Sequence, residues 1–356
     1  MNPRQLLGLA GGFLLVYIVI TLTNRPVVTP REPAGAGPDA AAASPAADQA
    51  GRVRGFTLLP PPGAPVDDAS SLAALRAIAG TGARWVALRP VLTQATGTSP
   101  EVPADATPPE ELARWRKVLQ EAHAAGLAVM LRPLVAAADG TRREAIAPPA
   151  PTAWLASWER ALQPWLTLAQ AERVELFCLG SNMTRLQAEA GWRDLATRAR
   201  TQYTGRLTYA SSVEEAAYRQ VSWWDAVDYV GLDAFFPLSR TAEPDGEALR
   251  LGWQGVVDEL TAWRGQAPDR PVLFTAVGVP SVVGGAIAPA LPDATAPRDE
   301  GLPARAAEAL FATVWQQPWF AGMFWHTWAG GGRAHEAFRT ADTPTAAALQ
   351  AGYGAP

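Results

Sequence analysis

Two arginines occupy matching places at the ends of short apolar runs in this sequence. Arg89 lies in a segment Ala-Leu-Arg-Pro, and Arg132 lies in a segment Met-Leu-Arg-Pro. If the two runs are neighbouring strands, both guanidinium groups reach one edge of a cleft, where their planar forks could bind a carboxylate or phosphate group of a ligand. They could equally pair with an acid of the same cleft, such as Asp233. The sequence leaves both roles open.

Four further polar residues follow other apolar runs. Ser181 and Asn182 come directly after one run, Asp233 ends the next but one, and His326 ends the last. Hydroxyl, amide, carboxylate and imidazole groups can all exchange hydrogen bonds with sugar hydroxyls. We therefore treat all four as candidate substrate-binding residues.

Two tryptophans flank His326 in the same terminal run. Trp325 and Trp328 belong to a chain with 14 tryptophans in total, a large number for 356 residues. Their flat indole faces could stack on sugar rings, or they could fill the core, as large aromatic side chains usually do. The sequence alone does not decide between ligand stacking and core packing for these two tryptophans.

Composition excludes several classes of function. The net charge is −4, so the chain as a whole lacks the basic field that nucleic-acid binding requires, and no nucleic-acid partner is expected. Three scattered histidines and the single cysteine Cys178 give no spacing suited to metal ligands. We therefore expect neither a metal nor a cofactor.

Short apolar runs alternate with longer amphipathic segments from residue 54 onward. We expect strands at 54–59, 85–88, 128–131, 174–179, 206–210, 229–232, 271–276 and 322–325. We expect helices at 70–79, 109–125, 154–170, 191–203, 247–264, 302–315 and 343–350. This alternation predicts an α/β protein with a (β/α)8 TIM barrel. A doubly wound sheet is the alternative, although no glycine-rich phosphate loop follows the first strand.

A barrel of this kind brings the candidate residues together. The carboxyl ends of its parallel strands meet at one face, and functional residues gather there. All candidates named above lie at such ends. Long loops at 93–107, 136–149, 235–246 and 280–301 are expected to wall the cleft.

Several segments resemble glycoside hydrolase family 113, the mannanase-like barrels of the large retaining clan A. The resemblance covers about residues 54–353. The segments that carry it are Gly-Leu-Ala-Val-Met-Leu-Arg-Pro at 126–133, Phe-Cys-Leu-Gly-Ser-Asn-Met at 177–183, Trp-Trp-Asp-Ala-Val-Asp-Tyr-Val-Gly-Leu-Asp-Ala-Phe-Phe-Pro-Leu at 223–238 and Gly-Met-Phe-Trp-His-Thr-Trp at 322–328.

The resemblance implies two catalytic glutamates that this sequence does not have. The acid/base should end the fourth strand, where Asn182 stands, and the nucleophile should end the seventh, where Ala276 stands. A retaining glycosidase needs both carboxyl groups, about 5–5.5 Å apart. The catalytic residues are therefore unknown. A substitute inverting pair of Asp233 with Glu214 or Glu215 is one alternative, and a structural Asp233 that orders the loop before Pro237 is the other.

The first residues indicate a membrane segment. Arg4 precedes an uncharged apolar run over 6–22, at the lower end of the roughly 17–25 residues that span a bilayer. We predict a signal anchor or transmembrane helix over 1–23, with a cleaved signal peptide as the alternative. The Pro/Ala-rich stretch 24–51 predicts a disordered linker, which leaves 52–356 for the barrel. We expect the barrel to be exported, to the periplasm or outside the cell, and held at the membrane unless the segment is cleaved.

Three functions fit these observations. The first is a catalytically inactive, membrane-tethered barrel that binds an oligosaccharide or polysaccharide of the envelope or the extracellular space. The second is an active O-glycosyl hydrolase with relocated carboxylates such as Asp233. The third is a structural or assembly scaffold with a protein partner in the cell envelope.

Overall fold

The computed structural model describes residues 51–104, 107–293, 295–330 and 332–354. The transmembrane segment expected over 1–23 and nearly all of the linker expected over 24–51 lie outside these residues. A search of the described ranges found no helix that is both long and apolar enough to cross a membrane.

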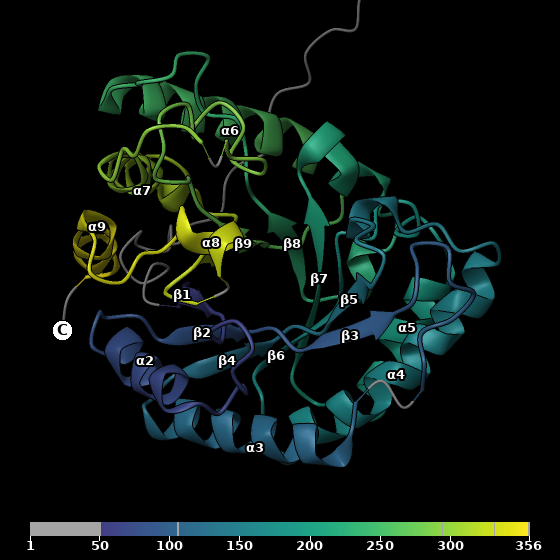
Figure 1. Cartoon of the computed structure of the whole chain (residues 1–356). Helices are drawn as coiled ribbons and strands as arrows, with labels where there is room; N and C mark the ends of the chain where they lie inside the picture. Colours follow the sequence, from purple (N-terminus) through teal and green to yellow (C-terminus); the bar gives the residue numbers. More distant parts are fainter. Residues whose placement is uncertain (1–50, 105–106, 294, 331, 355–356) are drawn as a thin grey trace, which may run out of the picture. The chain divides into compact units, whose positions relative to one another are not determined.

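Eight parallel strands close into a barrel, as the sequence predicts (Figure 1). In the order of their hydrogen bonding around the barrel they are β1 (Val53–Leu58), β10 (Phe320–Trp325), β9 (Val272–Val277), β8 (Tyr229–Asp233), β7 (Arg206–Ser212), β6 (Leu176–Ser181), β4 (Ala128–Leu131) and β2 (Trp85–Leu88). Since β2 pairs in turn with β1, the sheet has no free edge among these strands.

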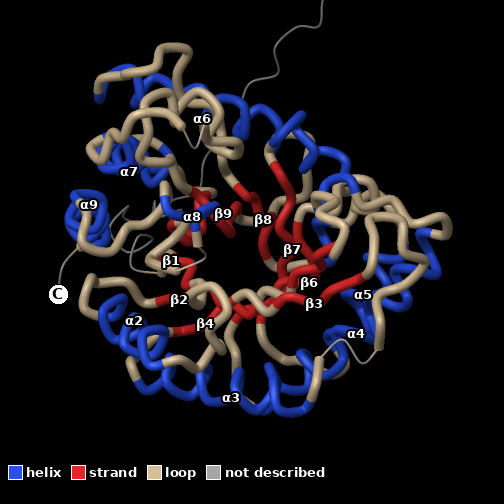
Figure 2. The backbone as a smooth tube through the Cα atoms, viewed as in Figure 1, coloured by secondary structure: helices blue, strands red, loops and turns tan. Residues whose placement is uncertain are grey.

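Helices lie outside the strands and cover the barrel (Figure 2). They are α2 (Ala69–Ala79), α3 (Pro109–Ala124), α4 (Pro151–Ala171), α5 (Gly191–Arg200), α6 (Gly246–Arg264), α7 (Leu302–Ala312), the short α8 (Arg333–Glu336) and α9 (Pro344–Tyr353). Pro164 lies inside α4 without ending it. The (β/α)8 prediction is confirmed, with helix ends shifted by a few residues.

The strands reach further toward their carboxyl ends than the apolar pattern predicts. Ser181 pairs with Ala210, and Ser212 pairs with Asp233, which pairs in turn with Ala276. The hydrogen bonds between strands join backbone groups, so a strand can continue through polar residues after the apolar run of the sequence has ended. Polar groups of the site therefore stand on strands and are held rigidly.

A second, two-stranded parallel sheet was not anticipated. It consists of β3 (Val91–Gln94) and β5 (Leu134–Ala137), which directly follow the two Arg-Pro pairs. It joins the loops that follow β2 and β4, and the backbone N–H of Gly97 donates a hydrogen bond to Asp139 across it, over 3.1 Å. Each of these strands has only four residues, and the apolar pattern of so short a segment cannot distinguish a strand from a loop.

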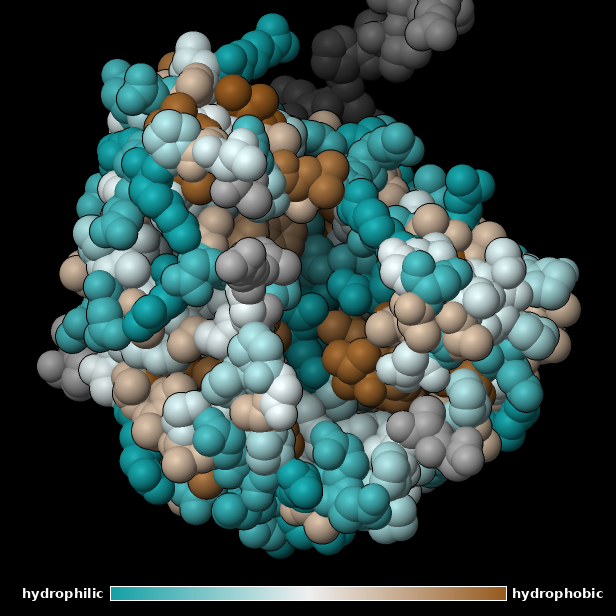
Figure 3. All heavy atoms as spheres, in the orientation of Figure 1, coloured by the Kyte–Doolittle hydropathy of each residue, from teal (hydrophilic) through white to brown (hydrophobic). Residues whose placement is uncertain are grey.

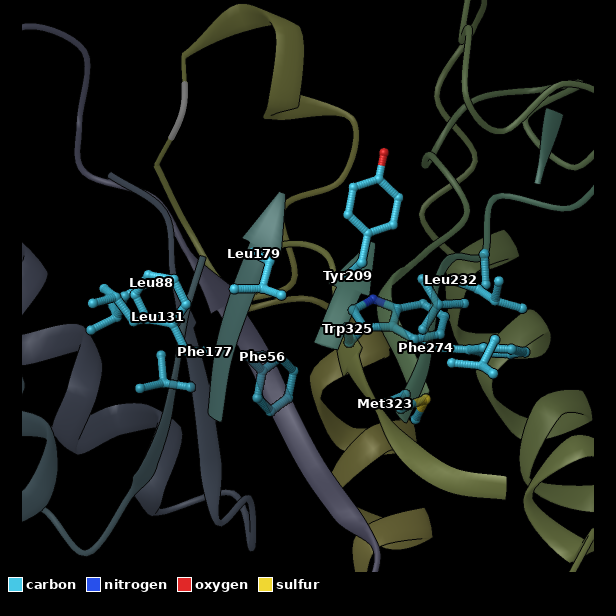
Figure 4. Packing of buried hydrophobic residues seen from close by; sticks show 14 of the residues in the cluster. Phe56, Leu88, Leu131, Phe177, Leu179, Tyr209, Leu232, Phe274, Met323 and Trp325 are labelled. Atoms are coloured by element: carbon cyan, nitrogen blue, oxygen red, sulfur yellow. The ribbon is translucent and has the colours of Figure 1, made fainter. Parts of the chain in front are cut away.

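Large aromatic and aliphatic side chains fill the core (Figure 4). Trp158 is fully buried, and its indole N–H donates to the carbonyl of Leu179 over 2.9 Å. The indole N–H of Trp253 is satisfied in the same way by the carbonyl of Ala306. Most of the tryptophans are thus core residues whose polar atom has a partner, as buried indoles require.

Gly231 in β8 tests how tightly the barrel interior is packed. A methyl group at this position would overlap the carbonyl oxygen of Tyr209 and lie 2.7 Å from Oγ1 of Thr208. We expect Gly231→Ala to lower the free energy of unfolding by about 3 kcal/mol or more, at the upper end for overpacked cores. Denaturant titration followed by tryptophan fluorescence measures this change.

Gly255 in α6 is the matched control. It is exposed, and a methyl group there would meet nothing within 4 Å. Gly255→Ala should stabilise the protein by about 0.5–1 kcal/mol, because alanine has the higher helix propensity. Equal effects of the two substitutions would contradict the packing described here.

Candidate functional site

A cavity of about 380 Å³ opens at the carboxyl ends of the barrel strands. Figure 3 shows this face hollowed at its centre, with hydrophilic residues in the hollow. Residues singled out in the sequence that line the cavity are Arg89, Arg132, Asn182, Asp233, Ala276 and His326. Other polar lining residues come mainly from loops and are Thr141, Arg142, Arg143, Glu144, Ser212, Glu214 and His335. The barrel thus brings most of the predicted candidates to one place.

The Asp233 side chain accepts three hydrogen bonds from other side chains. Its Oδ2 accepts from Nη2 of Arg132 over 2.5 Å and from Nδ2 of Asn182 over 2.8 Å. Its Oδ1 accepts from Oγ1 of Thr275 over 2.9 Å. Both oxygens are engaged by protein groups on three other strand ends.

Arg132 is paired on every side as well. Its Nε donates to Oγ of Ser181 over 2.8 Å, and its Nη1 donates to the carbonyl of Thr275 over 3.2 Å. Only 2% of its surface is exposed. The sequence left open whether Arg132 binds a ligand or pairs with an acid of the cavity, and in the structure it pairs with Asp233. Ser181, fully buried, supports Arg132 from behind.

Both members of this pair are held in their charged forms. Burial, the largest single effect, raises the pKa of the Asp233 carboxyl, but the charge of Arg132 and the hydrogen bonds from Arg132, Thr275 and Asn182 together lower it below its usual value. Burial, again the largest single effect, lowers the pKa of Arg132, but the charge and hydrogen bond of Asp233, together with smaller contributions from Cys178 and Tyr209, raise it above its usual value. Asp233 is therefore ionised at neutral pH.

Asn182 and Ala276 stand at the cavity wall, where the family resemblance expects glutamates. Asn182 follows β6 with a positive φ of 51°, a conformation that asparagine tolerates better than most residues. Among the described residues its Oδ1 has no hydrogen-bond partner, although the residue is only 8% exposed. Ala276 in β9 offers a methyl group.

His326, which is buried, and His335, which is half-buried, form a pair beside these residues. Nε2 of His326 and Nδ1 of His335 are 3.0 Å apart, and the rings of Phe235 and Phe338 contact His326 edge-on. Burial, and after it the charge of Arg89, lowers the pKa of both rings, that of His335 to about 4. Both histidines are therefore neutral at pH 7. Within the described chain Nδ1 of His326 has no partner.

Two arginines of the cavity differ from Arg132 because they are unpaired. Arg89 follows β2, and Arg143 begins a short 3-10 helix (Arg143–Ala145) in the loop after β5. Neither has a hydrogen bond or ion pair with any described residue, and Nε of each is buried. Burial, and after it the charges of Arg132 and Arg143, lowers the pKa of Arg89 to about 9, so it stays protonated at pH 7.

A fourth arginine of the cavity, Arg142, contacts two glutamates of the surrounding loops. Nε of Arg142 lies 3.2 Å from Oε2 of Glu144, and its Nη2 lies 3.4 Å from Oε2 of Glu214. Glu214 had been named from the sequence, whereas Arg142, Arg143, Glu144 and His335 had not. Arg142, Arg143 and Glu144 lie in the stretch 136–149, which the sequence predicts to wall the cleft, whereas His335 lies in the short helix α8, which the sequence pattern does not predict.

The two predicted tryptophans lie in the core rather than at the cavity. Trp325 is 1% exposed and packs in the same cluster as Leu232 and Phe274 (Figure 4). Trp328 packs edge-to-face on Phe56, with ring centroids 5.1 Å apart. Their indole faces are covered by protein and are not available to stack on a ligand.

The described residues contain no group of three or more His, Cys, Asp or Glu side chains that could hold a metal ion. The polar side chains that line the cavity carry guanidinium, carboxylate, amide, hydroxyl and imidazole groups. They can bind and orient a polar ligand.

The buried ion pair of Arg132 and Asp233 predicts that the stability of the protein depends on pH. Asp233→Asn leaves Arg132 without its counter-charge and should cost about 3–5 kcal/mol at pH 7. The folded pKa of Asp233 lies below the unfolded value near 3.8, so the stabilisation by the pair is fully present above that pH and is lost as pH falls below 3.8 and through the folded pKa. Urea titrations should show the gap between wild type and variant narrowing over this range.

The exposed pair of Asp225 and Arg193 is the control. It also has two hydrogen bonds, each 2.7 Å long, but both side chains are nearly half exposed. Asp225→Asn should cost much less, because exposed ion pairs contribute little. A gap for Asp233→Asn that stays constant down to pH 3 would show that the charge of Asp233 is not what stabilises the fold.

Comparison with known proteins agrees with the resemblance seen in the sequence. No relative was found among curated proteins. A GH113 β-1,4-mannanase complex has 20% identity and a TM-score of 0.73, covering 86% of this chain and 99% of its own. The GH113 β-mannanase of Alicyclobacillus acidocaldarius in complex with ManMIm has 26% identity and a TM-score of 0.73, covering 86% and 98%. A GH5_18 protein from Streptomyces cattleya in complex with GlcNAc has 13% identity and a TM-score of 0.57, covering 85% and 80%.

The sequence profile described as Glycoside Hydrolase Family 113 matches residues 64–343, which is most of the barrel. Together with the closed eight-stranded barrel, this match assigns the family. The chain belongs to glycoside hydrolase family 113.

Proposed function

We propose that this chain is a non-catalytic member of the family that binds an oligosaccharide in its cavity. The observation that carries the proposal is the pair Asn182 and Ala276, which line the cavity at the two positions where the family resemblance expects catalytic glutamates. On this proposal both glutamates have been replaced, and the barrel serves as a receptor for a polysaccharide of the envelope or the extracellular space.

The two side chains cannot perform retaining hydrolysis. One carboxylic acid must protonate the leaving oxygen, and a second carboxylate must attack the anomeric carbon. The amide of Asn182 has no proton to give in a useful pKa range, and the methyl group of Ala276 is no nucleophile. General acid catalysis alone is typically worth about 10²–10⁴ in rate, so the loss of both groups removes the mechanism.

Asp233 is poorly suited to replace them. Its lowered pKa keeps it ionised, whereas a general acid must be protonated. Its two oxygens already accept hydrogen bonds from Arg132, Asn182 and Thr275. Glu144 and Glu214 are both held by Arg142. These contacts support binding over the alternative of relocated carboxylates.

The cavity suits a short saccharide. Its volume of about 380 Å³ is at the lower end of the range of roughly 300–1,000 Å³ for small-molecule sites. Oδ1 of Asn182 and Nδ1 of His326 are buried and have no partner among the described residues, and both can bond to sugar hydroxyls. Because the two GH113 structures named above are β-mannanases, β-1,4-linked mannose oligosaccharides are the first ligands to test.

We further propose that the barrel is exported and held at a membrane by residues 1–23, with 24–51 as a tether. The basis is the apolar run at 6–22 and the Pro/Ala-rich stretch after it. A receptor of this design would hold a polysaccharide close to the membrane surface.

The proposal predicts binding without cleavage. The protein should bind at least one oligosaccharide in calorimetric titrations, and it should release no new reducing ends from mannan, glucan or amino-sugar polymers. Asn182→Ala removes the free acceptor and should weaken binding roughly 2- to 10-fold, the effect of one hydrogen bond.

Asp233→Asn and Glu214→Gln distinguish the protein's own activity from a contaminant. Cleavage by the wild type that disappears in either variant would contradict the proposal and favour relocated carboxylates. Cleavage that persists in both belongs to another enzyme in the preparation.

The membrane tether has its own test. Deletion of residues 1–23, which contain the apolar run, should move the protein from the membrane pellet to the supernatant after cell fractionation. A chain replaced only over the linker, residues 24–50, should remain in the pellet. Recovery of the full-length protein in the supernatant would show that it is not anchored.

A further inference from the structure

We propose that the cavity selects an acidic saccharide, and that Arg89 and Arg143 bind its carboxylate. This inference rests on the proposed carbohydrate-binding function and names the class of sugar: a uronic acid rather than a neutral hexose. The observation behind it is the two unpaired guanidinium groups in the cavity wall.

A guanidinium group whose buried Nε has no hydrogen-bond partner is unusual in a folded protein. Buried polar groups are nearly always hydrogen-bonded, and those that are not call for an explanation. Arg89 and Arg143 both line the cavity with a buried Nε, and neither has a hydrogen bond or ion pair with any residue of the described ranges. A ligand with anionic oxygen atoms would supply the missing acceptors.

The carboxylates of the cavity are already used by other arginines. Asp233 is taken by Arg132 at 2.5 Å. Glu144 and Glu214 both lie against Arg142. Because Arg142 takes two of the three acids and Arg132 takes the third, Arg89 and Arg143 have no ion-pair partner among the described residues.

The charge of the cavity fits a ligand with one negative charge. Four arginines (Arg89, Arg132, Arg142 and Arg143) face three carboxylates (Glu144, Glu214 and Asp233), which leaves one positive charge. His326 and His335 add none, since both are neutral at pH 7. A sugar carboxylate neutralises this charge, whereas a phosphate ester with about −1.5 to −2 charges exceeds it.

The remaining groups of the cavity suit the rest of a sugar. A planar guanidinium fork matches a carboxylate, which can accept two parallel hydrogen bonds from it. Oδ1 of Asn182 can accept from a ring hydroxyl, and Nδ1 of His326 can donate or accept according to its tautomer. The cavity therefore combines an anion-binding wall with neutral groups for hydroxyls, as a uronic acid residue requires.

The test compares ligands that differ only at C6. Full-length protein in detergent is titrated with tetrasaccharides of β-1,4-linked mannose, of β-1,4-linked mannuronate and of 6-O-sulphated β-1,4-linked mannose. We expect the mannuronate form to bind at least tenfold more tightly than the neutral form, and the difference to shrink at 0.5 M salt.

Three variants locate the anion. Arg89→Gln and Arg143→Gln should each weaken binding of the mannuronate form roughly 10- to 150-fold, the effect of a hydrogen bond to a charged group, and leave binding of the neutral form within about threefold. Arg250→Gln removes an exposed arginine of α6 with the same change in net charge, and it should change neither. Circular dichroism melting checks that each variant is folded.

The outcomes separate this inference from the proposed function. Equal binding of the neutral and acidic forms by the unaltered protein, or acidic binding unchanged in both cavity variants, overturns the inference and leaves the proposed function standing. Tighter binding of the sulphated form than of the mannuronate form overturns the assignment to a carboxylate. Failure of all three tetrasaccharides to bind counts against the proposed function itself.

Discussion

The buried ion pair of Arg132 and Asp233 is the constraint on which the rest of the site depends. Each buried charge costs several kcal/mol in lost hydration, and the pair is tolerated only when its remaining donors and acceptors are satisfied. Ser181, Asn182 and Thr275 provide those partners. One electrostatic requirement therefore fixes the ends of β4, β6, β8 and β9 relative to one another.

This constraint also limits what the cavity can do. An acid-base catalyst needs a carboxyl group whose pKa is raised toward neutrality, and the contacts of Asp233 lower its pKa instead. With the loop acids bound to Arg142, the groups still free to interact are cationic or neutral. These contacts are the physical basis of the proposed binding function, and the surplus of positive charge is the basis of the proposed preference for an acidic sugar.

Much of the fold could be predicted from the sequence, because strands buried on both faces are continuously apolar and stand out between helical segments. The positions of Asp233 and His326 at the cavity followed from that topology. The roles of Arg143 and His335 did not, since a loop and a helix as short as α8 carry no periodic signal. Trp325 was placed correctly at a strand end, but pattern alone could not tell that its indole packs in the core.

Arg89 and Arg132 show most clearly what local sequence leaves undetermined. Both follow a strand and precede a proline, and both line the same cavity. Arg132 is neutralised because Asp233 on β8 reaches it, whereas Arg89 has no ion pair with any described acid. The role of each arginine is thus decided by the number of acids on the opposing strands and loops. Because the cavity is lined by one acid fewer than it has arginines, one positive charge is not neutralised by the lining residues, and a ligand can neutralise it.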